Sequence, residues 1–313
     1  MQGRLLPALF VFLAGCASIP PHVSHVAAGQ VPVELVDAPF YAQERYQCGP
    51  AALATALASS GLSVNLGNLV DRVYLPGRQG SLQVEMLGAT RTAGRIPYIV
   101  DGTLQALMNE LADGRPVIVL QNLGVAAIPK WHYAVVVGID PARKHVVLRS
   151  GTDQRRVTRT RTFLRTWRRG DYWAFVVLRP DELPADMDRH RYLKSIAAFE
   201  RAGRDADAAI VWQTALSAWP DDPVALFGLG NARLASGDNE TAEELFRAIL
   251  EQQPGSVVAR NNLAMALARQ ARFDEARSEI AEALDINDNP ALGKELEDTA
   301  ALVERLSHTE SAN

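Results

Sequence analysis

Hydrophobic residues follow two different patterns along the first 180 residues of the chain. Up to residue 112 the apolar positions mostly recur at helical spacing, whereas from residue 116 they form short continuous runs of strand length. The first pattern predicts helices over residues 50–60, 64–73, 82–94 and 103–112. The second predicts strands over 116–120, 131–139, 145–149 and 171–178, and residues 96–100 are also strand-like. Helices followed by antiparallel strands indicate an α+β domain over residues 37–180.

Beyond residue 180 the sequence becomes rich in alanine and repeats with a period of 34 residues. The positions that keep this spacing are Ala208, Ala242 and Ala276; Trp212, Phe246 and Ile280; and Pro220 and Pro254. Small residues let paired helices approach closely, and the large residue fills the groove to the next repeat. The pattern resembles tetratricopeptide repeats over 189–222, 223–256 and 257–290, the first of them degenerate. A capping helix over 291–306 and a tail over 307–313 complete the predicted all-α domain.

The start of the chain resembles a bacterial lipoprotein signal. Arg4 precedes an apolar run from Leu5 to Leu13 that is too short to span a bilayer, and Leu13-Ala14-Gly15-Cys16 follows. The resemblance implies a signal peptide over residues 1–15, lipidation of Cys16, and an extended tether over residues 16–36. It further implies a lipid-anchored protein of the bacterial envelope, on the outer membrane and facing the periplasm. An ordinary secretory signal cut near Ala17 or Ser18 is the alternative.

Composition limits the function classes. With 48% hydrophobic and 22% charged residues the chain is globular rather than disordered, and a net charge of −4 indicates no nucleic-acid partner. Only two cysteines are present, so lipidation of Cys16 would leave Cys48 without a disulfide partner in an oxidising compartment. An unpaired thiol there favours a chemical role, the alternative being a small buried core residue. No cluster with metal-ligand spacing occurs, so no metal or other cofactor is expected.

Cys48 stands where a helix is predicted to begin. Pro50 suits the first helical turn and the alanines after it are strong helix formers, so backbone N–H groups should converge on the thiol and favour thiolate. A thiol nucleophile needs a base, a group that orients the base, and an amide donor for the oxyanion. Among the six histidines, only His132 begins a long apolar strand in the same domain. Gln43 and Gln47 are the candidate oxyanion donors.

The strand register suggests the group that orients His132. If the turn over 140–145 lets Asp140 oppose His145, then His132 lies opposite Asp153, and a tighter or looser turn shifts the partner to Ser150, Gly151 or Thr152. Asp140 itself lies about 26 Å along the strand and cannot reach the imidazole. Asp153 is therefore the predicted acidic member of the site.

These residues together resemble a known family. Gln43, the run Cys48-Gly49-Pro50-Ala51-Ala52, and His132 with its apolar strand to Gly138 are similar to the bacteriocin-processing, double-glycine-type leader peptidases of the papain-like clan. The resemblance covers residues 36–180. It implies a papain-like fold with Cys48 as nucleophile, His132 as base and Gln43 as oxyanion donor. The chain departs from the family pattern in two places. The amide lies one residue closer to the cysteine, which keeps Gln47 as a second candidate, and Ser150-Gly151 replaces the usual Asp-Pro. Either Asp153 therefore reaches in from the following loop, or Ser150 or a water orients the ring.

The sequence therefore predicts a lipid-anchored cysteine peptidase that acts on a peptide or protein and carries repeats for partner or substrate binding. One alternative is a non-catalytic envelope scaffold with a degenerate peptidase-like domain, and another is an amidase or peptidyl transferase. The repeats could also only stabilise the first domain by docking on it.

An arginine-rich segment between residues 155 and 169 stays open to two interpretations. Its arginines are Arg155, Arg156, Arg159, Arg161, Arg165, Arg168 and Arg169. They could form a patch for an acidic substrate or for anionic lipid headgroups. Alternatively they form the solvated face of a strand and a helix, because threonines alternate with them.

Overall fold

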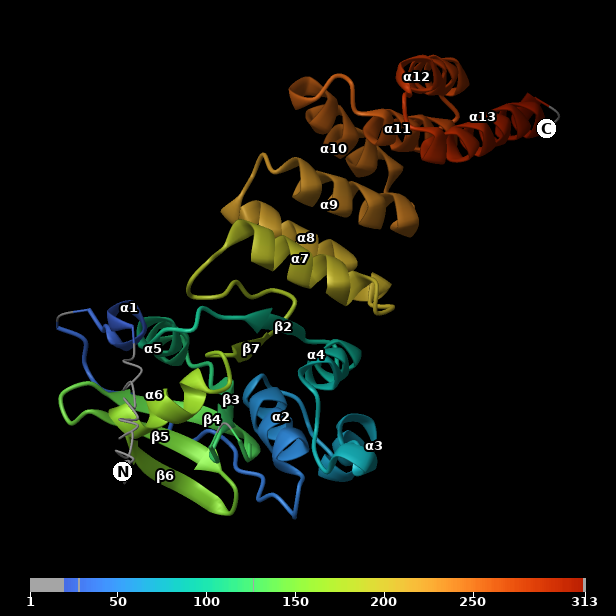
Figure 1. Cartoon of the computed structure of the whole chain (residues 1–313). Coiled ribbons are helices and arrows are strands. Elements are labelled where there is room, and N and C mark those ends of the chain that lie inside the picture. The colour runs from blue at the N-terminus through green and yellow to red at the C-terminus, as the bar shows by residue number, and fades with distance from the viewer. Residues whose placement is uncertain (1–19, 28, 126, 312–313) are drawn as a thin grey trace, which may run out of the picture.

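The computed structural model describes residues 20–311 except residues 28 and 126. The predicted signal peptide over residues 1–15 and the predicted lipidation site at Cys16 lie outside the described residues. Within them, no helix is both long and apolar enough to cross a membrane. The chain forms an N-terminal domain built on one sheet and a C-terminal array of paired helices (Figure 1).

The N-terminal domain is organised on an antiparallel sheet. Within the described residues the strand order is β2-β7-β3-β4-β5-β6, and β1 pairs with β4. The strands are β1 (Val33–Glu34), β2 (Ile96–Ile99), β3 (Val117–Asn122), β4 (Trp131–Asp140), β5 (His145–Ser150), β6 (Asp153–Arg159) and β7 (Ala174–Leu178). The central strand β4 is buried on both faces, which explains its continuous apolar run.

Helices cover both faces of this sheet. On one face lie α2 (Cys48–Ser59), α3 (Leu66–Val73) and α4 (Gln83–Thr92), and on the other lie α5 (Leu104–Ala112) and α6 (Thr160–Arg168) (Figure 1). Alternate residues of β4 divide between the faces, so Tyr133 and Val135 pack with α2, whereas Ala134 and Val136 pack with α5 and α6. This arrangement confirms the α+β prediction.

The β4–β5 hairpin has the predicted turn but a different register near the site. Asp140 does oppose His145, but a bulge between Val136 and Gly138 shifts the pairing, and the ladder ends at Val135 and Arg149. β5 then ends at Ser150 and turns into β6, where Asp153 pairs with Ser150. The expected opposition of His132 and Asp153 is therefore wrong, because the β5–β6 hairpin begins before the β4–β5 pairing extends as far as His132.

The segment before the domain is docked on it along its described part. Val23, in the short helix α1 (Pro21–Ser24), is only 3% exposed and packs in the core beside α5, and β1 pairs with β4. The buried Arg149 side chain holds the next stretch by donating to the backbone carbonyl oxygens of Leu35, Val36 and Ala38. The extended tether predicted over residues 16–36 is thus docked at Val23 and at Val33–Glu34, whereas Val31 and Val36 are exposed.

The C-terminal domain consists of three helix pairs and a longer final helix, as the period predicts. The elements are α7 (Arg189–Glu200), α8 (Asp205–Ala218), α9 (Pro223–Ser236), α10 (Asn239–Gln252), α11 (Val257–Arg269), α12 (Phe273–Ile286) and α13 (Pro290–Ser311). The repeated alanines and the large residues four positions later are buried. Gly228 shows how closely the helices pack, since a Cβ there would lie 2.3 Å from the Trp212 ring. The repeat prediction is confirmed.

The first helix of the array is packed against the sheet domain. Residues of α7 such as Tyr192, Ile196 and Phe199 share one core with the strand residues around Tyr98. The Tyr98 hydroxyl donates to the carbonyl of Asp186 and accepts from the backbone N–H of Asp188. A core that crosses the junction makes the two parts one cooperative unit.

This junction predicts a cooperative effect of Tyr98→Phe. The change removes two hydrogen bonds to partly buried backbone groups, so we expect the free energy of unfolding to fall by about 0.5–1.5 kcal/mol. Thermal unfolding followed by circular dichroism should still show one transition for the whole protein. Tyr74→Phe is the matched control, because its hydroxyl makes no hydrogen bond within the described residues. Two separate transitions in the unsubstituted protein would show that the shared core does not couple the parts.

Candidate active site

Cys48 is the first residue of α2 and lies against the start of β4. Nine of the twelve residues of α2 are buried, because alanines let the helix pack closely on the sheet. The sulfur meets the backbone N–H groups of Gly49, in its own helix, and of Tyr133. The Tyr133 N–H belongs to the peptide bond that follows His132. The fold therefore brings the two main candidate residues to one place, although 84 positions separate them in the sequence.

The environment of the thiol opposes its ionisation. Burial raises the pKa of Cys48 above its ordinary value, and the N–H groups of Tyr133 and Gly49, which act in the other direction, do not compensate for it. The expected preference for thiolate is therefore wrong for the unoccupied protein. The helix start supplies favourable N–H groups, but tertiary packing removes the solvent that would stabilise the negative charge.

His132 is the second residue of β4, and Ser150 at the end of β5 orients its ring. The imidazole Nε2 and the Ser150 Oγ are 2.8 Å apart, a hydrogen bond whose direction depends on the tautomer. When Nε2–H donates to the hydroxyl, Nδ1 keeps its lone pair and can accept a proton. Ser150 thus occupies the place at which a triad has its third member.

A hydroxyl orients the ring but cannot balance its charge. Burial lowers the pKa of His132 to about 4, and the positive charge of Arg156 lowers it further in the same direction. At neutral pH the imidazole is therefore uncharged. A neutral imidazole is able to accept a proton, but it does not hold a thiolate as an ion pair.

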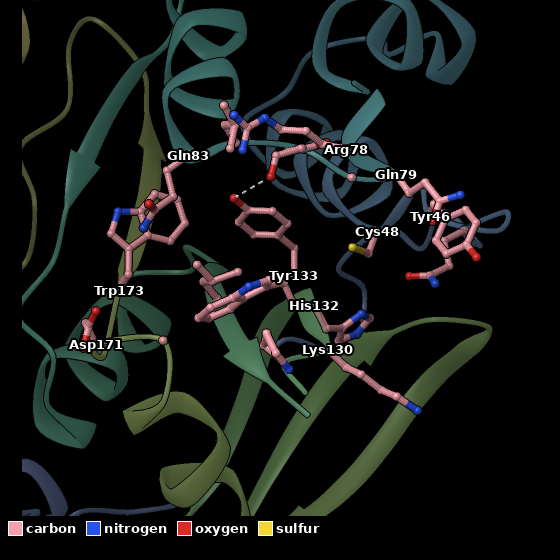
Figure 2. A pocket seen from close by; sticks show the side chains of 18 residues that line it. Tyr46, Cys48, Arg78, Gln79, Gln83, Lys130, His132, Tyr133, Asp171 and Trp173 are labelled. Atoms are coloured by element: carbon pink, nitrogen blue, oxygen red, sulfur yellow. Dashed lines mark hydrogen bonds between the residues drawn. The ribbon is translucent and has the colours of Figure 1, made fainter. Parts of the chain in front are cut away.

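Cys48 and His132 line one cavity of about 800 Å³, and Figure 2 shows both side chains at its wall. The structure records no hydrogen bond between the thiol and the imidazole among the described residues. Catalytic hydrogen bonds are often long in unoccupied enzymes and shorten when substrate binds. The cavity is large enough for several residues of an extended peptide.

Asp153 is placed away from this cavity. Its side chain is 60% exposed and lies 3.9 Å from the Arg156 guanidinium, and it is not among the described residues that line the cavity. Ser150, from which the hairpin turns toward Asp153, is the residue that meets the ring. The geometry thus gives the orienting contact to the residue at the family position and not to the predicted carboxylate.

The structure separates the two candidate oxyanion donors. Gln43 lines the cavity together with Cys48 and His132, and its backbone N–H donates to the carbonyl of Gly151, which fixes the segment before the helix. Gln47 immediately precedes α2 and does not line the cavity. This placement favours Gln43 as the amide that faces a substrate carbonyl.

Sequence reasoning misses the loop and the aromatic residues that complete the cavity. The Tyr133 hydroxyl donates to the carbonyl of Ser81, and the Tyr133 ring meets Trp173 edge to face at 5.9 Å (Figure 2). The loop around Ser81 packs directly on the helix start, since a Cβ on Gly49 would lie 2.4 Å from Ser81 Oγ. The glycine after the cysteine is the one available signal of this close approach.

Tyr46, two residues before Cys48, has a left-handed backbone with φ 69° and lies beneath the Arg45 guanidinium at 4.8 Å. Such a conformation is uncommon for a tyrosine and often marks a functional segment. Among the described residues, no group of three or more His, Cys, Asp or Glu side chains is arranged to hold a metal ion.

The Ser150 contact leads to a prediction about the pKa of His132. In Ser150→Asp a carboxylate faces the ring and favours the protonated imidazole, so the pKa should rise from about 4 by roughly 1–3 units. Nuclear magnetic resonance titration of the ring protons measures it, with His132→Gln identifying the signal. Ser150→Asn, which adds similar bulk without charge, should keep the pKa near the original value. Equal values in the two variants would contradict the contact.

Comparisons with known proteins match the two domains to different families. Residues 35–172 match the Peptidase_C39 like family, and residues 233–297 match the tetratricopeptide repeat. No curated protein matches the chain. Among solved structures, one named as a C39-like peptidase from Bacillus anthracis is 14% identical and covers 48% of this chain and 98% of its own, with a TM-score of 0.40.

Two further structures match separate parts of the chain. The peptidase domain of Streptococcus ComA, a bi-functional ABC transporter, is 18% identical and covers 45% of this chain and 98% of its own, with a TM-score of 0.38. The Yersinia enterocolitica secretion chaperone SycD, in complex with a YopD peptide, is 18% identical and covers 39% and 93%, with a TM-score of 0.35. The chain therefore carries a C39-like peptidase domain followed by tetratricopeptide repeats.

Proposed function

We propose that residues 37–180 form a cysteine peptidase that hydrolyses peptide bonds through Cys48 and His132. The observation that carries the proposal is the shared cavity, into which α2 brings the thiol and β4 brings an imidazole oriented by Ser150. The family match over residues 35–172 supports the same chemistry. Gln43 lines the cavity beside them and is the proposed oxyanion donor.

The neutral state of both groups defines the first step. Cys48 gives its proton to His132 Nδ1 while its sulfur bonds to the substrate carbonyl carbon, and the Gln43 amide stabilises the oxyanion. The C–N bond then breaks, and the imidazolium gives this proton to the leaving amine. Water attacks the resulting thioester with His132 again accepting a proton, which releases the acid and restores the thiol. Proton transfer is concerted with attack, because burial disfavours a preformed ion pair.

A second candidate function, a non-catalytic envelope scaffold, is favoured by the same electrostatics. A thiol with a raised pKa, an imidazole with a pKa of about 4 and a serine in place of the usual carboxylate are all expected of a degenerate site. In that case the repeats would carry the function. An amidase or peptidyl transferase would use the same residues with a different acceptor.

Covalent capture distinguishes an enzyme from a scaffold. A mixture of blocked peptidyl chloromethyl ketones should label Cys48, and His132→Gln should slow this labelling by about 10²–10⁴-fold because the general base is lost. Labelling by iodoacetamide should change little in the same variant, which controls for access to the thiol. In wild-type protein the rate of labelling by the peptidyl chloromethyl ketones should fall only below about pH 4, when His132 becomes protonated. Equal rates in both proteins, with no cleavage of a peptide library, would favour the scaffold.

We further propose that Cys16 carries a lipid that anchors the protein in the bacterial envelope, on the outer membrane and facing the periplasm. We also propose that the repeats bind a partner or substrate protein. The signal-like run before Cys16 supports the anchor. The first helix of the array is packed on the sheet domain, so the second and third repeats are the part available for a partner.

The anchor predicts that Cys16→Ser moves the protein out of the membrane fraction. Loss of the acylated residue removes the lipid that holds the chain at the bilayer. Fractionation of cells and mass spectrometry of the N-terminal peptide measure the two effects, and Cys48→Ser is the matched control. Lipidation would be refuted if the Cys16→Ser variant stayed with the membranes and the wild-type protein had an unmodified N-terminal peptide.

A further inference from the structure

A second cavity lies at the opposite end of β4 from the catalytic one. Its volume is about 690 Å³, and Ile139, near the end of β4, and the β4–β5 turn form one side of it. His132 and Asp140 are eight residues apart on this strand, which separates the two cavities by about 26 Å. The second cavity therefore has no part in the proposed thiol chemistry.

The rim of this cavity is cationic and its floor is apolar. Lys144, Arg159 and Arg161 line the rim, and Leu104, Ile139 and Leu164 line the floor. The three cations are exposed, and none lies within ion-pair distance of a carboxylate of the described chain. Other cations of the region are paired, since Arg143 meets Asp140 at 3.5 Å and Arg155 meets Glu34 at 2.7 Å. In a chain of net charge −4, unpaired cations around one cavity favour an anionic ligand.

The backbone holds these cations together. The Thr160 N–H donates to the carbonyl of Lys144 at 2.8 Å, so the start of α6 is tied to the β4–β5 turn. Lys144 has a left-handed backbone with φ 55°, a conformation that glycine or asparagine adopts more readily than lysine. No side chain caps the first turn of α6, which adds partial positive charge to the same rim.

A cationic rim over an apolar floor suits an anionic amphiphile better than a simple ion. The N-terminal segment also indicates where such a ligand would come from, because Ser24 and Val26 form another wall of the cavity. Val23 is fixed in the core, and α1 begins five residues after Cys16, a stretch of at most about 18 Å. The lipid anchor proposed above would therefore hold this face close to the headgroups of the membrane.

We propose that this cavity binds the anionic headgroup of a membrane phospholipid, with the first acyl carbons against its apolar floor. The site gives a role to part of the arginine-rich segment that the peptidase chemistry does not use. It would fix the orientation of the protein on the bilayer, with the catalytic cavity at the far end of β4 and open to the periplasm. The cavity chemistry stands without the anchor, which supplies only the direction of approach.

Vesicle binding by the full chain tests this site. In a Cys16→Ser background, which removes the acyl chains, Arg159→Gln with Arg161→Gln should weaken binding to phosphatidylglycerol vesicles by about 25-fold, since each cation near an anionic surface contributes roughly fivefold. Binding to phosphatidylcholine vesicles should not change, which accounts for any contribution of the apolar N-terminal run. Arg72→Gln with Lys194→Gln, at exposed positions on α3 and α7, removes the same charge and should have little effect.

Competition separates a lipid site from a phosphate site. Soluble dihexanoyl phosphatidylglycerol should displace the protein from anionic vesicles, whereas inorganic phosphate at equal ionic strength should not. An equal loss of binding in the two double variants would overturn the proposal, because diffuse surface charge would then suffice. Equal competition by phosphate would also overturn it. A last outcome would also overturn it. If the Arg159→Gln, Arg161→Gln variant lost binding to polyglutamate but kept vesicle binding, the cavity would be assigned to an acidic peptide.

Discussion

The burial of α2 against the sheet is the constraint on which the candidate site depends. Its alanines allow the helix to lie close to β4, and this places the Cys48 sulfur against the peptide bond that follows His132. The same packing removes water from the thiol and raises its pKa. The packing that places Cys48 beside His132 therefore also disfavours ionisation of the thiol. The N–H groups at the helix start are not enough to offset this effect.

Ser150 adds to this constraint. A carboxylate in its place would lower the cost of a protonated imidazole, whereas a hydroxyl fixes the ring without supplying charge. With Arg156 nearby, the imidazole stays neutral over most of the accessible pH range. A site of this kind can still transfer a proton during attack, but it depends on the substrate to exclude water and to shorten the distance between thiol and ring.

Hydrophobic periodicity was sufficient to predict most of the fold. The helices and strands of the first domain and the three repeats have clear periods, because each buries an apolar face. β6 escaped a firm prediction, since its arginines and threonines carry little apolar pattern. α6 does bury an apolar face through Phe163, Leu164 and Trp167, but the arginines between these residues drew attention to its charged face instead. The exposed residues of β6 agree with the interpretation of that segment as a solvated strand and helix.

The site was predictable in part, for reasons that differ between residues. Cys48 and His132 each stand at the start of an element, so pattern and family resemblance locate them. Asp153 was misplaced because β5 ends at Ser150 and turns into β6, where Asp153 pairs with Ser150, and neither this turn nor the bulge between Val136 and Gly138 has a reliable signal in the sequence. The pKa of Cys48 and of His132 depends on burial by distant segments, which no local motif reports.

The shared core at the junction has a consequence for how a substrate could reach the thiol. Because α7 packs on β2 through residues such as Ile196, the repeats and the catalytic cavity keep a fixed geometry. A protein held on the later repeats could not be carried to Cys48 by a swinging domain. It would have to present an extended segment long enough to span the interval, at about 3.3 Å per residue. For the peptidase proposed above, this geometry favours substrates with unfolded or flexible segments over compact ones.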